Sequence, residues 1–193
     1  MNQPLRGPTS SVVLVGLMGS GKSTVGRMLA ERWRLPFVDL DVEIERISGL
    51  SISEIFELEG EAGFRARESE ATRAITVSSP IVVAVGGGWM ARPETRDAWP
   101  DATRVWLRVS PQEAARRLAM HDVARPLLAN ELPEKVLQDL LDRRLPAYRL
   151  SEYTVDTSNR TAALVADAVA VVIDRAGGVE VADERMDSEP STE

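Results

Sequence analysis

Several residue types and patterns are scarce or missing in this chain of 193 residues, and each absence excludes a class of protein. Cysteine is absent, which excludes disulfide frameworks, thiolate zinc sites and cysteine nucleophiles. His121 is the only histidine, so a multi-histidine metal site cannot form. No apolar run reaches the roughly 20 residues that span a bilayer, and residues 1–9 lack the apolar core of a signal peptide. We therefore expect a soluble, cytoplasmic protein without a membrane partner.

The net charge of −7 is concentrated at one end of the chain. From residue 177 onward, six acidic side chains oppose Arg185 alone, which leaves this segment at −5. The other 22 basic and 24 acidic residues bring the rest of the chain to only −2. A nearly neutral domain with an acidic tail does not favour nucleic acid as a partner. Because arginine supplies 21 of the 23 positive charges, Lys22 is not the product of a lysine-rich composition.

Short apolar runs alternate with helical patterns along the chain. The segments predicted as strands are 12–15, 37–39, 81–85, 103–109 and 153–156. Those predicted as helices are 25–33, 61–74, 134–144 and 161–175, with further helix starts at the capping box of Ser51 and Glu54 and at Ser110-Pro111. Such alternation predicts an α/β fold, in which helices cover both faces of a mostly parallel sheet.

The predicted elements form one domain with a segment on either side. We expect a domain of residues 11–176, an N-terminal extension of residues 1–10 and an acidic, disordered tail of residues 177–193. Within the domain, residues 118–132 show mixed polarity and no clear period, which predicts a mobile lid.

The strongest motif is the segment 16–23, Gly-Leu-Met-Gly-Ser-Gly-Lys-Ser, which fits the phosphate-loop pattern between an apolar strand and a helix. Its glycines let backbone N–H groups point at phosphate oxygens, and the helix adds the positive end of its dipole. Lys22 would reach the β- and γ-phosphates, and the Ser23 hydroxyl would bind Mg²⁺. The residues expected to bind the nucleotide here are Gly19, Ser20, Gly21, Lys22, Ser23 and Thr24. The alternative, a glycine turn before an amphipathic helix, is less well supported by the complete pattern.

Two carboxylates follow the second predicted strand, at the edge that would carry the phosphate loop. If the strand continues through Asp39 and Asp41, both side chains point to the same side. One could then hold Mg²⁺ through water while the other takes a hydroxyl proton. A pair like this is more often a solvated turn or a helix N-cap, but the phosphate loop upstream favours the catalytic interpretation.

Glycines and arginines supply the remaining candidates. The triple glycine at residues 86–88 follows a buried strand, which indicates either a close approach of backbone to a ligand or a flexible turn. Arg65 could bind an anionic substrate or lie on a solvated helix face. Arg125, in the predicted lid, is placed to close on a transferring phosphate. Arg144 ends a predicted helix, where a cation also favours the helix dipole.

The combined motifs resemble the shikimate kinase family. They are GLMGSGKST at 16–24, DLD at 39–41, FR at 64–65, GGG at 86–88, RPLL at 125–128 and RRLPAYR at 143–149. The resemblance implies a P-loop fold similar to nucleoside monophosphate kinases: three α/β/α layers, a five-stranded parallel sheet, a mobile lid and, by default, a monomer. It also implies ATP-dependent phosphorylation of the shikimate 3-hydroxyl, in chorismate and aromatic amino acid biosynthesis.

The resemblance further implies a role for each candidate residue. Asp41 would bind substrate hydroxyls and act as general base, and Asp39 would hold Mg²⁺ through water beside Ser23. The shikimate carboxylate would be bound by Arg65 and Arg144, with backbone contacts from Gly86, Gly87 and Gly88. The nucleotide would meet the lid residue Arg125, and Arg117 and Arg160 would flank its adenine. Lys22, Asp41 and Arg125 form the predicted catalytic set.

Three departures from the family pattern affect these expectations, and one of them is the acidic tail, which lies outside the resemblance and has no assigned role. Trp89 and Met90 follow the triple glycine, where small residues are usual, so the indole either narrows the substrate pocket or turns outward. Thr161-Ala162 stands where a proline often helps to sandwich the adenine.

Two alternative functions remain. One is a related small-molecule kinase for gluconate or a nucleotide, against which the GGG and RPLL motifs speak. The other is a non-catalytic nucleotide-binding switch, which would not need the residues that grip a small acid.

Overall fold

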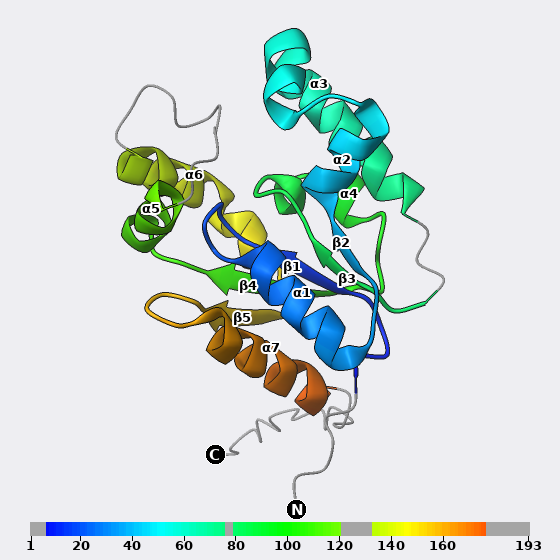
Figure 1. The fold of residues 1–193 in the computed structure, drawn as a ribbon, viewed down its shortest axis with the longest axis vertical. Coiled ribbons are helices and arrows are strands. Elements are labelled where there is room, and N and C mark those ends of the chain that lie inside the picture. Colours follow the sequence, from blue (N-terminus) through cyan, green and yellow to red (C-terminus); the bar gives the residue numbers. More distant parts are fainter. Residues whose placement is uncertain (1–6, 76–78, 121–132, 177–193) are drawn as a thin grey trace, which may run out of the picture.

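A five-stranded, all-parallel sheet forms the centre of the protein (Figure 1). In the computed structural model, which describes residues 7–75, 79–120 and 133–176, the strand order is β2-β3-β1-β4-β5. The strands are β1 (Val12–Val15), β2 (Phe37–Asp39), β3 (Val82–Ala84), β4 (Thr103–Arg108) and β5 (Tyr153–Asp156). All five predicted strands are present, although β3 and β4 are slightly shorter than predicted, and the α/β fold class is confirmed.

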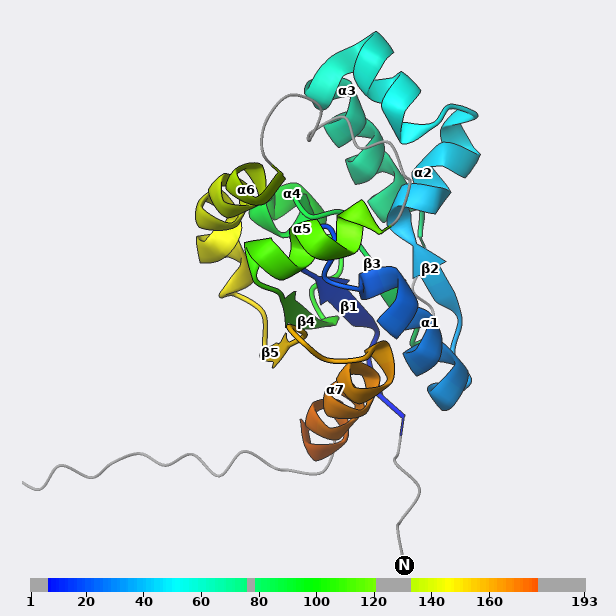
Figure 2. The same ribbon diagram turned by 60° about the vertical axis from the view of Figure 1, so that its left-hand side comes forward.

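Helices cover both faces of this sheet. They are α1 (Lys22–Trp33), α2 (Leu40–Ser48), α3 (Ile52–Ala74), α4 (Pro93–Arg96), α5 (Pro111–Ala119), α6 (Pro133–Tyr148) and α7 (Ala162–Ala176), with a short 3-10 helix η1 at Trp89–Ala91. Helices α1 and α7 contact each other in front of the sheet in Figure 1. The pair α2 and α3 lies beyond β2, and the pair α5 and α6 lies beyond β4 (Figures 1 and 2).

The central strand β1 explains why the described residues form two hydrophobic cores. Its four residues are completely buried, and successive side chains point to opposite faces. Val12 and Leu14 pack with residues of α1 and α7, whereas Val13 and Val15 pack with residues of α2, α3 and α6. Each such side chain contributes roughly 1.5–3 kcal/mol by leaving water. The strand whose end leads into the phosphate loop is therefore packed on both faces of the sheet.

One predicted feature of the helices is confirmed, and the helices differ from the prediction in three other places. The confirmed feature is the capping box, in which Ser51 Oγ accepts from Glu54 N and Glu54 accepts from Ser51 N. The helix that begins there continues to Ala74 through a kink at Gly60, whose φ is +68°, so the two predicted helices join as α3. Helix α6 extends past Arg144 to Tyr148 and holds Pro146 near its end. Helix α2 was not predicted at all.

Several predictions fall on residues outside the described ranges. These are the lid core at residues 121–132, with His121 and Arg125, the acidic tail at residues 177–193, and residues 1–6 of the N-terminal extension. Within the described ranges, no helix has both the length and the apolar character that crossing a membrane requires.

Candidate active site

The phosphate loop joins β1 to α1 and packs tightly against neighbouring strands and helices. Gly16 has a φ of +141° and Gly19 a φ of +79°, both unfavourable for other residues. A Cβ on Gly16 would lie 2.5 Å from Leu107 O, and one on Gly19 would lie 2.9 Å from Ala114 O. Gly21 precedes α1 without a side-chain cap, so the first turn can offer its N–H groups to an anion.

The polar residues of the loop differ in their exposure and in their hydrogen bonds. Lys22 Nζ donates to Gly16 O at 3.0 Å and to Leu17 O at 2.8 Å, so its ammonium group lies over the loop. Ser20 has a buried side chain, and its N–H donates to Leu17 O at 3.2 Å. Thr24 lies exposed in the first turn of α1. The loop carbonyl groups of Gly16 and Leu17 thus accept hydrogen bonds from within the loop, and Lys22 supplies the positive charge of the loop.

Ser23 and Asp39, the predicted metal residues, are in direct contact. Ser23 Oγ donates to Asp39 Oδ2 at 2.5 Å. The other oxygen of Asp39 accepts from Asp41 N at 3.3 Å and caps α2. The strand β2 ends at Asp39 and does not continue through Asp41. Instead, the Asp39 side chain accepts a hydrogen bond from the Asp41 N–H and caps the start of helix α2. Asp39 is thus an N-cap and also the partner of Ser23, because its two oxygens face different groups.

Charged side chains from three helices meet at the triple glycine, residues 86–88. A Cβ on any of these glycines would collide with one of them. A Cβ on Gly86 would lie 2.6 Å from Glu68 Oε1 and 3.4 Å from Asp41 Oδ1. One on Gly87 would lie 2.5 Å from Arg144 Nη1, and one on Gly88 would lie 2.6 Å from Arg65 Nη2. The structure therefore brings Asp41, Arg65 and Arg144 together, and the absence of side chains at 86–88 makes room for them.

Glu68 is the site residue that the sequence reasoning missed. Its side chain is fully buried on α3, and Oε2 accepts from Arg65 Nη1 at 3.0 Å. Burial raises the pKa of Glu68, Arg65 opposes this effect, and the charge of Asp41 adds to it. Oε1 has no hydrogen-bond partner among the described residues. Three-residue spacing on a helix is the signal that could have paired Glu68 with Arg65.

Tyr148 anchors the middle of the triple glycine. Its hydroxyl donates to Gly87 O at 2.6 Å, and its ring stacks on Trp106 with centroids 5.6 Å apart. Burial raises the pKa of Tyr148, although the charge of Arg144 opposes this effect, so the hydroxyl stays a donor at neutral pH. Arg144 itself is nearly buried on α6. Two guanidinium groups beside a fixed backbone form a geometry that suits a small planar carboxylate.

Trp89 belongs to the core. Its indole is completely buried, its Nε1 donates to Thr72 Oγ1 at 3.0 Å, and its ring stacks on Trp99 with centroids 5.4 Å apart. An outward turn of Trp89 is therefore wrong, because burial and a partner for the indole N–H both favour the interior.

The residues predicted to flank the adenine lie near Thr157, which follows β5. Arg117 Nη2 donates to Thr157 O at 2.5 Å, and its Nη1 donates to Gly19 O at 3.2 Å. Arg160 is exposed, and its backbone N–H donates to Thr157 O at 3.3 Å. Arg117 and Arg160 thus both reach the segment between β5 and α7, and Arg117 also touches the phosphate loop. Arg125 lies outside the described residues.

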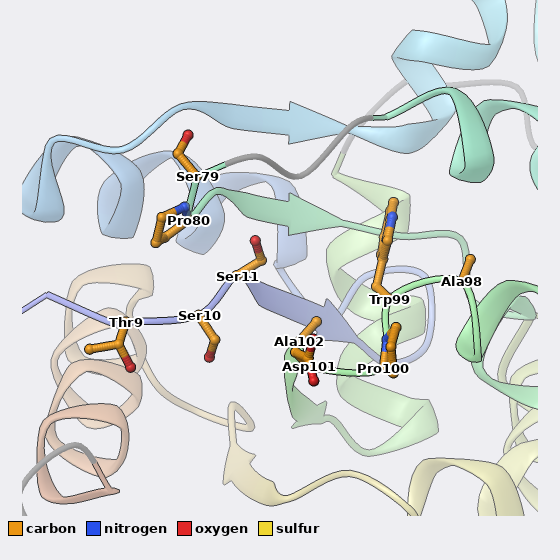
Figure 3. A pocket seen from close by; sticks show the side chains of 10 residues that line it. All are labelled: Thr9, Ser10, Ser11, Ser79, Pro80, Ala98, Trp99, Pro100, Asp101 and Ala102. Atoms are coloured by element: carbon orange, nitrogen blue, oxygen red, sulfur yellow. The ribbon is translucent and has the colours of Figure 1, made fainter.

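A cavity of about 380 Å³ lies at the other end of the sheet (Figure 3). Its lining includes Ser11, Pro80 and Ala102, which precede β1, β3 and β4. It shares no residue with the site at the carboxyl ends of the strands.

The fold and the site define a P-loop phosphotransferase. The phosphate loop, a serine–aspartate pair beside it and a cluster of arginines and carboxylates around the triple glycine all lie at the carboxyl edge of one parallel sheet, where α/β proteins bind ligands.

Comparison with known proteins specifies the family. Residues 18–174 match the model of the shikimate kinase family. A shikimate kinase from Parasynechococcus marenigrum is 44% identical over 159 residues, which are 82% of this chain and 83% of that protein. The solved shikimate kinase from Acinetobacter baumannii in complex with shikimate is 39% identical, with a TM-score of 0.79 over 86% of this chain and 94% of that one. A gluconokinase from Sinorhizobium meliloti shares the fold alone, at 22% identity and a TM-score of 0.57 over 90% of this chain and 95% of that one.

The chain belongs to the shikimate kinase family. It has shikimate kinase activity, that of an ATP-binding phosphotransferase in aromatic amino acid biosynthesis, as the resemblance of its motifs implied.

Proposed function

We propose that shikimate binds at the triple glycine, with its carboxylate on Arg65 and Arg144 and its 3-hydroxyl on Asp41. The convergence of these three side chains on residues 86–88 is the observation that carries the proposal. The backbone of Gly86, Gly87 and Gly88 adds contacts that no residue with a side chain would permit. The Acinetobacter baumannii relative, solved with shikimate, supports the same class of substrate.

Asp41 acts as the general base in this proposal. Its carboxylate accepts the hydrogen bond of the 3-hydroxyl and holds the oxygen for in-line attack on the γ-phosphate. Lys22 binds the β- and γ-phosphates from the loop opposite. Phosphoryl transfer has a loose transition state, so catalysis comes mainly from positioning and from stabilisation of charge. Glu68 supports this arrangement by accepting a hydrogen bond from Arg65.

Ser23 and Asp39 fit a Mg²⁺ site. A hydroxyl and a carboxylate oxygen 2.5 Å apart are ligand types that Mg²⁺ takes, together with phosphate oxygens and water. Bound there, Mg²⁺ neutralises charge on the β- and γ-phosphates. Ser23 would contact the ion directly and Asp39 through water. No cluster of three or more acidic or histidine side chains that could hold a metal occurs in the described part of the chain, and this arrangement needs none.

The other parts of the proposal concern the nucleotide and the whole chain. Gly19, Ser20, Gly21 and Thr24 complete the phosphate site, and Arg117 and Arg160 flank the adenine. Arg125 closes on ATP as part of a lid at residues 118–132. We also propose a cytoplasmic monomer, with shikimate and ATP as its only partners and with residues 1–10 and 177–193 outside the catalytic domain.

Replacing Arg65 tests the substrate site, and Arg67 offers a matched control on the same helix. Arg67 pairs with Glu59 at 2.5 Å instead of facing the glycines. A hydrogen bond between charged groups contributes about 1.5–3 kcal/mol, so Arg65→Ala should raise the KM for shikimate roughly 10- to 150-fold. Arg67→Ala should leave it unchanged, and neither variant should alter the KM for ATP. An unchanged KM for shikimate in Arg65→Ala would remove Arg65 from the site.

A further inference from the structure

Glu113, on the first turn of α5, lies between two arginines. Its Oε2 accepts from Arg116 Nε at 2.7 Å, and its Oε1 accepts from Arg116 Nη2 and from Arg117 Nε, both at 2.8 Å. These hydrogen bonds, first from Arg116 and then from Arg117, lower the pKa of Glu113 to about 2. The carboxylate is therefore ionised at any physiological pH and holds both arginines.

The two arginines differ in what else they reach. The side chain of Arg116 is 60% exposed. Within the described ranges its one hydrogen-bond partner besides Glu113 is Met120 Sδ, at 3.5 Å. Arg117 has a side chain 20% exposed and gives Glu113 its Nε alone. Its two terminal nitrogens are left for other acceptors. Arg116 thus ends at the surface, whereas Arg117 continues toward the nucleotide site.

The acceptors of Arg117 lie on two segments far apart in sequence. Nη1 donates to Gly19 O in the phosphate loop at 3.2 Å and to Thr157 Oγ1 at 3.3 Å, and Nη2 donates to Thr157 O at 2.5 Å. Thr157 is completely buried, and its N–H donates to Arg108 O at 2.8 Å. A single guanidinium group therefore joins α5, the phosphate loop and the segment after β5.

We propose that Glu113 is a positioning residue for ATP binding, which holds Arg117 in the orientation that ties Gly19 to Thr157. The proposal rests on the proposed place of Arg117 in the nucleotide site. Arginine has about 2 kcal/mol of rotamer entropy, so without an acceptor for Nε the side chain would sample other orientations. The phosphate loop would then lose its contact from Gly19 O to Arg117.

The test is a double-mutant cycle on steady-state kinetics. Glu113→Ala should raise the KM for ATP roughly tenfold, the effect of losing one charged hydrogen bond, and leave the KM for shikimate within twofold. Because Glu113 acts through Arg117, the variant that combines Glu113→Ala with Arg117→Ala should match Arg117→Ala alone. Glu113→Gln, which keeps an acceptor for Arg117 Nε, should restore most of the affinity. Arg116→Ala, the matched control, should leave both KM values unchanged.

Different results separate the two levels of the proposal. If Arg117→Ala raises the KM for ATP and Glu113→Ala does not, Glu113 has no positioning role and the nucleotide site stands. If the effects of the two substitutions multiply, or if Arg116→Ala matches Glu113→Ala, the inference is also overturned. If Arg117→Ala leaves the KM for ATP unchanged, the place of Arg117 in the nucleotide site is wrong and the inference fails with it. Melting curves of Glu113→Ala are compared with those of Glu113→Gln and Arg116→Ala, to show whether a raised KM comes from a loss of folding.

Discussion

Adding one methyl group at Gly87 should specifically damage shikimate binding. The new Cβ would lie 2.5 Å from Arg144 Nη1, whereas such contacts are ordinarily longer than 3.4 Å, so the guanidinium must move by about an ångström. Gly87 does not have a positive φ, so alanine meets no backbone strain there. Arg144 can move because the atom in contact is the end of a flexible side chain. The substitution should therefore leave the fold intact and shift one arginine.

The magnitude follows from the geometry of bidentate binding. A misplacement of about 1 Å can cost on the order of 100-fold in rate where the geometry must be tight, and a charged hydrogen bond contributes about 1.5–3 kcal/mol. We expect Gly87→Ala to raise the KM for shikimate between roughly 10- and 100-fold. The KM for ATP should not change, because the phosphate loop keeps its contacts.

Steady-state kinetics in two backgrounds provides the assay. In an Arg144→Ala background, Gly87→Ala should cause little further loss, since the group it displaces is already absent. Thermal melting checks that folding is retained. A KM for shikimate within twofold of the wild-type value in Gly87→Ala, with normal folding, would show that Gly87 is not needed to make room for Arg144.

Three further substitutions test the phosphate loop, the partner of Arg65 and the core around Trp89. Lys22→Ala should abolish phosphoryl transfer yet keep shikimate binding, measured by ADP release and by calorimetric titration with shikimate. Glu68→Gln should raise the KM for shikimate severalfold, because Arg65 loses a charged partner. It should also change the pH dependence of melting. Because the pKa of Glu68 is raised, the folded protein binds this proton more tightly than the unfolded chain does. The wild type therefore loses stability as the pH rises from the ordinary carboxyl range through the raised pKa. The glutamine variant has no such proton and should not show this loss. Trp89→Phe should destabilise the fold by about 2 kcal/mol in denaturant unfolding, since the hydrogen bond to Thr72 and part of the buried ring are lost, while kcat at low temperature stays near the wild-type value.

The sheet and its phosphate loop were predictable because their signals are local. A parallel strand buried on both faces is a continuous apolar run, as in β1 and β3, and a glycine-rich turn must follow it where backbone meets phosphate. The triple glycine was recognised for the same reason. A Cβ at Gly86, Gly87 or Gly88 would collide with a charged side chain, so these positions require glycine and the pattern was informative.

The missed features depend on tertiary contacts that no local pattern encodes. Helix α3 carries six glutamates, and only packing against α2 and the triple glycine distinguishes buried Glu68 from its exposed neighbours. Helix α2 has only nine residues, and its start depends on capping by the Asp39 carboxylate. In the sequence, Asp39 is equally consistent with the polar residue that ends a strand. The core position of Trp89 was not predicted, because its partners Thr72 and Trp99 lie 17 and 10 residues away along the chain.

A crystal structure of this protein with shikimate and ADP would show whether the substrate binds at the triple glycine. We expect the shikimate carboxylate within hydrogen-bond distance of both Arg65 and Arg144, and the 3-hydroxyl on Asp41, facing the phosphate loop. Shikimate bound away from the triple glycine, or turned so that its carboxylate meets neither arginine, would contradict this expectation.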